Sequence, residues 1–183
     1  MGAVEAKAAE ESKNTMDYLH NLHLDFNHKE LSFEISIDDI KEYFRRVITK
    51  DIGLFEFGID RSRFDLIRVN TRNQKIKGYE FKISKADFRR DDKWKQYLFF
   101  CHSLTFVCPY KLIDRSELPA NIGLLYIVKW RHKDPVWKKN NDYRFVEGLW
   151  VRKPRNQELD KDKYIYVIST LLNRAKWRQN EFF

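Results

Sequence analysis

The sequence predicts a mixed α/β domain whose sheet is at least partly antiparallel. An amphipathic segment at 36–51 has helical spacing, and three short apolar segments follow it with turn residues between them. Helical spacing returns at 86–104 and near the C-terminus. The predicted order is therefore helix, two or three antiparallel strands, helix, strand, strand and helix.

The helix at 36–51 has the clearest signals for its ends. Ser36 or Asp38 can cap it, acidic residues crowd its first turn and basic residues its last. Its apolar stripe consists of Ile37, Ile40, Phe44, Val47 and Ile48.

The predicted strands are "LFEFGI", "RFDLIRVN" and "IKGYEFKI", and then "LTFVCPY" and the segment at 118–130. The turn "TRNQK" joins the second and third strands, so these two are expected to form a hairpin.

We expect residues 1–15 to be a flexible leader and residues 16–183 to form a single domain. Its core covers about 36–128. A basic, aromatic-rich extension covers about 129–163 and forms a hairpin or an arm, and a closing helix covers about 164–179.

The charge balance favours a polyanionic partner. Charged residues make up 34% of the 183 residues, and the net charge is +8. Nucleic acid and an anionic membrane surface both fit such an excess. No apolar run approaches the length of a membrane span, and the N-terminal residues lack the apolar region of a secretory signal. Cys101 and Cys108 read as small buried hydrophobes, so a reducing, cytoplasmic compartment is expected.

One strand carries a pair of charges with two interpretations. Glu80 and Lys82 are two residues apart and point to the same face, whereas Tyr79, Phe81 and Ile83 point to a core. The plain interpretation is a solvated face with a weak surface ion pair. The sharper one is a metal ligand beside a catalytic lysine.

The hairpin would bring a second carboxylate, Asp65, close to this pair. Two carboxylates on adjacent strands can chelate a hard cation such as Mg²⁺, with the carbonyl of Phe81 as a further ligand. Lys82 can then orient or deprotonate the attacking water, or stabilise charge on a phosphate. Phosphodiester hydrolysis needs these groups.

Asp65 followed by Glu80-Phe81-Lys82, with a helix before and a helix and strand after, resembles the PD-(D/E)xK nuclease superfamily. Over roughly 38–128 the chain resembles the MmcB-like family of DNA-repair proteins more closely. The residues that carry this resemblance are Glu80, Lys82, Ser84, Ala86, Asp87, Phe88, Asp91, Lys93, Trp94, Tyr97, Pro119, Gly123 and Leu124. Phe64 stands where the superfamily often has proline.

The resemblance implies a restriction-endonuclease-like αβββαβ core and a Mg²⁺-dependent nuclease acting on DNA, with Mn²⁺ able to substitute. Such nucleases work in repair, recombination or the processing of phage and mobile-element DNA. The alternative is a DNA-binding module of the same fold with little or no cleavage. A homodimer or a protein partner stays open.

Members of the superfamily often add a glutamate from the first helix. Glu42 is the candidate, with Glu34 and Glu56 as competitors, and Asp60 is a further loop carboxylate. We interpret Asp87 as the N-cap of a helix over "FRRDDKWKQY" at 88–97.

The expected nucleic-acid contacts come from two regions. They are Ser84, Lys85, Arg89, Lys93, Gln96 and Tyr97 after the Glu80 strand, and Lys138 and Lys139 in the extension. Basic residues with aromatics between them suit a phosphate backbone and stacked bases, although a solvated hairpin or a protein-binding surface fits the extension too.

Overall fold

The computed structural model describes residues 29–32, 34–132 and 145–177. The chain divides into two compact units, residues 1–31 with 130–144 and residues 32–129 with 145–183. The second unit contains the described helices and nearly all of the described sheet. The expected leader at 1–15 lies outside the described residues, and the single domain over 16–183 stays a prediction.

The described residues form strands and helices in the following order. They are β1 (Lys29–Ser32), α2 (Ile37–Val47), β2 (Ile52–Ile59), β3 (Ser62–Val69), β4 (Ile76–Phe81), α3 (Lys85–Arg90), α4 (Trp94–Tyr97), β5 (Ser103–Pro109), the 3₁₀ helix η2 (Arg115–Glu117), β6 (Gly123–His132), β7 (Phe145–Arg152) and α5 (Lys161–Trp177).

The sheet of the second unit is mixed, as the sequence predicts. Strands β2, β3 and β4 are antiparallel neighbours, whereas β4, β5 and β6 run parallel, and β7 pairs with β6. The β3–β4 hairpin is confirmed. Its turn is held by the Asn70 side chain, which accepts hydrogen bonds from the backbone N–H groups of Arg72 and Asn73.

Helix α2 covers one face of this sheet. Ser36 caps it in a capping box with Asp39. Phe44 is buried and lies 5.6 Å from Phe81, ring centre to ring centre, and 4.8 Å from Tyr79. The expected core side of the β4 strand is therefore confirmed for Tyr79 and Phe81. Ile83 lies beyond the strand and is 46% exposed, so its predicted place in the core is wrong.

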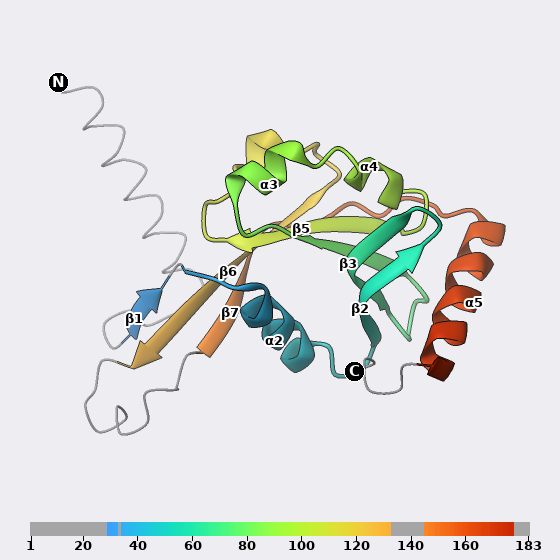
Figure 1. Cartoon of the computed structure of the whole chain (residues 1–183), viewed down its shortest axis with the longest axis horizontal. Coiled ribbons are helices and arrows are strands. Elements are labelled where there is room, and N and C mark those ends of the chain that lie inside the picture. Colours follow the sequence, from blue (N-terminus) through green and yellow to red (C-terminus); the bar gives the residue numbers. More distant parts are fainter. Residues whose placement is uncertain (1–28, 33, 133–144, 178–183) are drawn as a thin grey trace. The chain divides into compact units, whose positions relative to one another are not determined.

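Helices α3 and α4 lie over the opposite face (Figure 1). Phe88 of α3 and Trp94 of α4 both meet the ring of Phe106 edge-on, at 5.6 and 5.8 Å. Phe106 of β5 is in register with Glu80 of β4. Neighbours in register share a face, so Glu80 lies beneath these two helices.

The single helix predicted at 86–104 is wrong, because the chain forms the two short helices α3 and α4. The Asp91 side chain accepts a hydrogen bond from the Lys93 backbone N–H at 2.9 Å. Such a local bond offers the backbone an alternative to the helix. The two cysteines beyond α4 behave as expected, since Cys101 and Cys108 are buried and form no disulfide.

The described part of the extension serves the fold. β7 joins the sheet, and Trp150 packs against the α2 side of the core. The Arg152 guanidinium donates to the backbone carbonyls of Ile122, Leu118 and Pro119. Among the described residues no helix is both long and apolar enough to cross a membrane.

Phe44→Ala should lower the free energy of unfolding by about 3–5 kcal/mol, because it empties the contact between α2 and β4. Urea unfolding followed by circular dichroism measures the change. Val47→Ala is the matched control on the same helix, since Val47 is 41% exposed and its truncation should change stability little. Equal losses in the two variants would contradict this account of the core.

Candidate functional site

In the strand pair β2–β3, the side chains exchange faces of the sheet at Asp65. In the strand register Phe55 is opposite Leu66 and Phe57 is opposite Phe64, and the regular register is interrupted between these two pairs, at Glu56 and Asp65. Phe55 and Leu66 belong to the α2 side of the core.

The next pair faces the other way, since the Phe64 ring lies 4.7 Å from Tyr97 of α4. Regular alternation would keep Phe55 and Phe57 on one face. Glu56, with φ at +52°, is the irregular residue that lets the faces exchange.

The ladder between β3 and β4 also stops at this point. Its last pair is Leu66 with Tyr79, and the backbone N–H of Phe81 donates instead to Oδ2 of Asp65 at 2.7 Å. N–H and C=O of one strand residue point to the same side. The Phe81 carbonyl therefore faces the gap that the Asp65 carboxylate occupies.

Glu80 and Lys82 are buried rather than solvated. Each is 5% exposed, so the interpretation as an exposed surface ion pair is wrong. Nζ of Lys82 lies 3.0 Å from Oε1 of Glu80 and 2.7 Å from Oδ2 of Asp91, and 3.6 Å from Oδ2 of Asp87. Four charged groups thus meet beneath α3.

The second oxygen of Glu80, Oε2, is buried and has no hydrogen-bond partner among the described residues. Burial, and next the charge of Asp65, raise the pKa of Glu80 to about 8. Burial also raises the pKa of Asp65, against the lowering effects of the Phe81 N–H and Lys82. A positive ion between the two carboxylates would relieve both costs.

Lys82 is held as a cation. Burial by itself lowers its pKa, but contacts with Asp91 and Glu80 outweigh burial and raise the pKa above its ordinary value. Asp91 therefore has two roles, because one carboxylate oxygen ends the helix and the other contacts the lysine.

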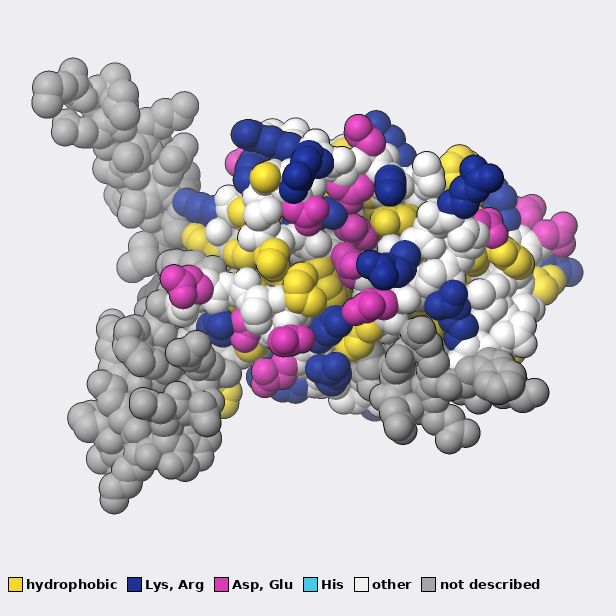
Figure 2. Space-filling model, in the orientation of Figure 1, with side chains coloured by type: hydrophobic (Ala, Val, Ile, Leu, Met, Phe, Trp, Pro, Cys, Tyr) yellow, Lys and Arg dark blue, Asp and Glu magenta, His cyan; other side chains and the backbone are white. Residues whose placement is uncertain are grey.

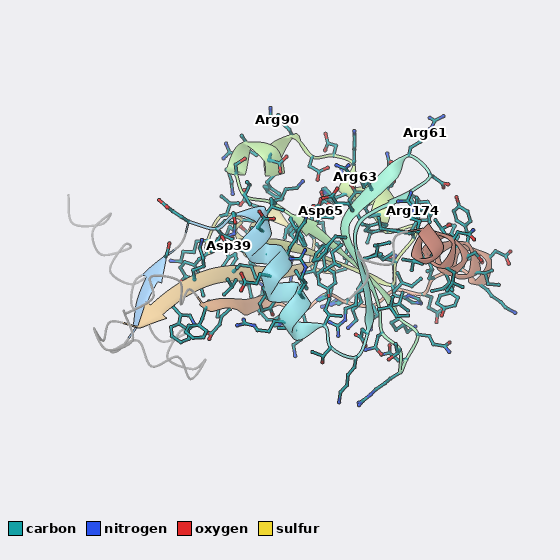
Figure 3. The ribbon with its side chains drawn as sticks, turned by 60° about the horizontal axis from the view of Figure 1, so that its bottom comes forward. Asp39, Arg61, Arg63, Asp65, Arg90 and Arg174 are labelled. Atoms are coloured by element: carbon teal, nitrogen blue, oxygen red, sulfur yellow. The ribbon has the colours of Figure 1, made fainter. Side chains whose placement is uncertain are left out.

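These groups open into a cavity of about 440 Å³. Its lining residues are Arg61, Ser62, Arg63, Asp65, Glu80, Lys82, Asp87, Arg90, Asp91, Lys93 and Tyr97. Figure 3 shows Arg63 and Asp65 on β3, Arg61 where β3 begins, and Arg90 on α3. Figure 2 shows a band of acidic side chains in the middle of this face with Lys and Arg on both sides. An acidic centre with a basic rim suits a cation and a polyanion together.

The other predicted carboxylates lie elsewhere. Glu42 is exposed on α2, and Glu34 is exposed before it, and neither lines the cavity. Glu56 is half-exposed and forms an ion pair of 2.9 Å with Lys41. Asp60 accepts a hydrogen bond from the Tyr166 hydroxyl.

Asp87 is not the helix cap that the sequence suggests. Ser84 caps α3 and accepts from the Asp87 N–H, so the Asp87 carboxylate is left free to face Lys82.

The residues expected to bind nucleic acid divide between the cavity and its surroundings. Lys93 and Tyr97 line the cavity. The Lys85 ammonium forms an ion pair with Glu117 and donates a hydrogen bond to the Leu112 carbonyl. The remaining ones do not line it: Ser84 caps α3, Arg89 is exposed, and Gln96 lines a neighbouring hollow. Lys138 and Lys139 lie outside the described residues.

Sequence reasoning missed three arginines at the cavity, Arg61, Arg63 and Arg90. Arg63 precedes Asp65 by two residues on β3, a spacing that could have drawn attention to it. Arg61 and Arg90 gave no such signal, because they reach the cavity only through the positions of the β2–β3 turn and α3.

The donor set fits a hard divalent cation. Asp65 and Glu80 supply carboxylate oxygens, and the Phe81 carbonyl faces the same gap. Within the described ranges no cluster of three or more His, Cys, Asp or Glu side chains is arranged to hold a metal. A cation here would therefore need the backbone oxygen, and water or substrate oxygens, to complete its ligands.

No family model matches the chain, and no curated protein matches it. Among solved structures it is similar to the SPO1766 protein of unknown function from Silicibacter pomeroyi, with 22% sequence identity and a TM-score of 0.56. The match covers 77% of this chain and 84% of that chain. At this identity the likeness concerns the fold alone.

The raised pKa of Glu80 has a consequence for stability without metal. The ordinary value is 4.5 and the folded value about 8, so the unfolded chain loses this proton first. The free energy of unfolding should fall as pH rises through that window. Glu80→Gln cannot ionise and should gain about 1 kcal/mol or more on the natural protein between pH 5 and pH 8.5.

Urea unfolding in EDTA at several pH values measures this gain. Glu42→Gln is the control, because Glu42 is exposed on α2 and its removal should leave the pH dependence unchanged. A stability difference between Glu80→Gln and the natural protein that stays constant from pH 5 to pH 8.5 would contradict the prediction.

Proposed function

We propose that this protein is a Mg²⁺-dependent nuclease that hydrolyses DNA phosphodiester bonds. One observation carries the proposal. The buried Oε2 of Glu80 lacks a hydrogen bond among the described residues, and the partly buried Asp65 carboxylate, whose charge acts on Glu80, lines the same cavity, which arginines also line. A buried carboxylate oxygen without a partner is costly, and a bound cation would satisfy it.

The order of elements supports a restriction-endonuclease-like core of the PD-(D/E)xK type, and with it the resemblance to the MmcB-like family. A helix precedes three antiparallel strands, short helices follow, and β5 then returns parallel to β4. Asp65 lies on the second of these strands and Glu80 and Lys82 at the end of the third. The fold alone would not give the activity, which rests on the cavity.

In this proposal Asp65, Glu80 and the Phe81 carbonyl hold the ion. Mg²⁺ in such a site supplies charge neutralisation at a phosphate oxygen and makes a water molecule more acidic. Lys82 stays protonated, because its carboxylate contacts raise its pKa. We therefore assign it to orienting the attacking water and stabilising charge on the phosphate, rather than to accepting a proton.

The basic rim would hold the DNA backbone. Arg61, Arg63, Arg90 and Lys93 line the mouth of the cavity, and Arg61, Arg63 and Arg90 are also exposed. Contacts of this kind position a strand without reading its sequence, and they weaken as salt rises.

One feature favours a second function, DNA binding without intrinsic cleavage. The Lys82 ammonium is already occupied by Glu80 and Asp91 at 3.0 Å and 2.7 Å. If these contacts persist when DNA binds, Lys82 is a structural counter-ion. Cleavage assays separate the two functions.

We expect cleavage of DNA with Mg²⁺ or Mn²⁺, and a loss of about 100-fold or more in Lys82→Ala and Glu80→Gln. Lys82→Ala removes a positive charge that would stabilise the reacting phosphate, and Glu80→Gln removes a carboxylate that would hold the ion. A panel of single-stranded, blunt duplex and branched DNA is incubated with each protein. Lys95→Ala is the control, since Lys95 is exposed on α4 and does not line the cavity. Absence of cutting, with tight salt-dependent binding that the variants retain, would favour the binding function.

Metal binding can be measured without any substrate. Millimolar Mg²⁺ should raise the thermal midpoint of the natural protein, because a ligand that binds only the folded state stabilises it. Glu80→Gln should lose this rise, whereas Asp92→Asn should keep it, since Asp92 is exposed and outside the cavity. A rise of equal size in all three proteins would place the metal elsewhere.

A further inference from the structure

We propose that a second hollow beside the cavity binds an unpaired base of the DNA strand whose phosphate enters the cavity. The hollow measures about 770 Å³ and lies between the β2–β3 turn, the turn after α4 and the start of α5. The inference rests on the proposed function, because that function makes the ligand of the hollow a part of DNA. It adds the form of DNA that is bound, which the cavity alone does not specify.

Two exposed aromatic rings line the hollow. Phe99 is 57% exposed and Tyr166 is 44% exposed. Nζ of Lys163 lies 5.0 Å from the centre of the Phe99 ring. Large apolar rings usually avoid water, and aromatic faces next to a cation are the groups on which proteins stack unpaired bases.

The segment that carries Phe99 is fixed in place. The Gln157 side chain donates to the backbone carbonyls of Leu98 and Cys101, which flank it. The Phe99 N–H donates to the Gln96 carbonyl at 3.1 Å. The fixed backbone therefore keeps the Phe99 ring exposed. A preorganised ring of this kind loses little conformational entropy when a ligand stacks on it.

The hollow continues from the cavity. Arg61 and Ser62 line both of them. A strand with one phosphate at Asp65 and Glu80 could therefore place an adjoining base on Phe99 without leaving the protein surface.

The charges of the hollow favour a base over a second phosphate. Arg61 and Lys163 are balanced by Asp60 and Asp162, and Asp60 accepts a hydrogen bond from Tyr166. A balanced, aromatic hollow suits a neutral ring, whereas the basic rim of the cavity suits a phosphate. A base inside a duplex is already paired and stacked, so the substrate class is single-stranded, overhanging or branched DNA.

Fluorescence anisotropy in EDTA tests the inference, because binding is then measured without cleavage. Phe99→Ala should weaken binding of a labelled single-stranded oligonucleotide about tenfold, in line with the loss of one stacked base. Binding of a blunt duplex of the same length should hardly change. Phe99→Trp should restore single-strand binding, since it returns an aromatic face.

Leu172→Ala is the matched control, because Leu172 is 65% exposed on α5 and does not line the hollow. The inference is overturned if Phe99→Ala binds single strands as the natural protein does, if it weakens both DNA forms equally, or if Leu172→Ala has the same effect. Thermal unfolding confirms that each variant is folded.

The two proposals can fail separately. Binding of single strands that depends on Phe99, in a protein that never cuts, would support the hollow and reject the nuclease. Cutting that needs Glu80 and Lys82 but ignores Phe99→Ala on every DNA form would support the nuclease and reject the hollow.

Discussion

The hydrogen bond from the Phe81 N–H to the Asp65 carboxylate is the interaction on which the cavity depends. It replaces the backbone bond that would otherwise continue the β3–β4 ladder. The strands can therefore separate at this point while the buried N–H keeps a partner, which a buried polar group requires. On the other side of β3, Glu56 has a left-handed backbone conformation, and the regular pairing of β2 with β3 is interrupted at Asp65 as well.

Charge is concentrated where the sheet opens. Burying Glu80 and Lys82 is costly unless each charge has a partner, and Asp91 completes the set by ending helix α3 within reach of the lysine. Apolar packing surrounds this charged group, with Phe44 on one face of the sheet and Phe106 on the other. The fold thus keeps a buried, charged centre because the surrounding core is well packed.

In our proposals the two hollows would bind different parts of a nucleic-acid strand. One combines buried and partly buried carboxylates with a basic rim, and the other combines exposed rings with balanced charges. Arg61, in the β2–β3 turn, lines both hollows. A phosphate is charged, whereas its neighbouring base is a neutral aromatic ring. The pair of sites therefore fits an extended strand better than a compact ligand.

The sequence by itself determined helix α2, the central strands and the pairing of the β3–β4 hairpin. The capped helix α2 with its apolar stripe, the turn "TRNQK" and the apolar segments all follow local rules of spacing and capping, which depend on near neighbours only. It also indicated Asp65, Glu80 and Lys82 as one group, because a hairpin fixes which residues face each other. Only the tertiary structure decided that Glu80 and Lys82 are buried, that the helix breaks at Asp91, and that Arg61 and Arg90 meet them. Those features depend on how elements that are distant in the sequence pack together. Neither the spacing nor the composition of a segment indicates which other segment will bury it.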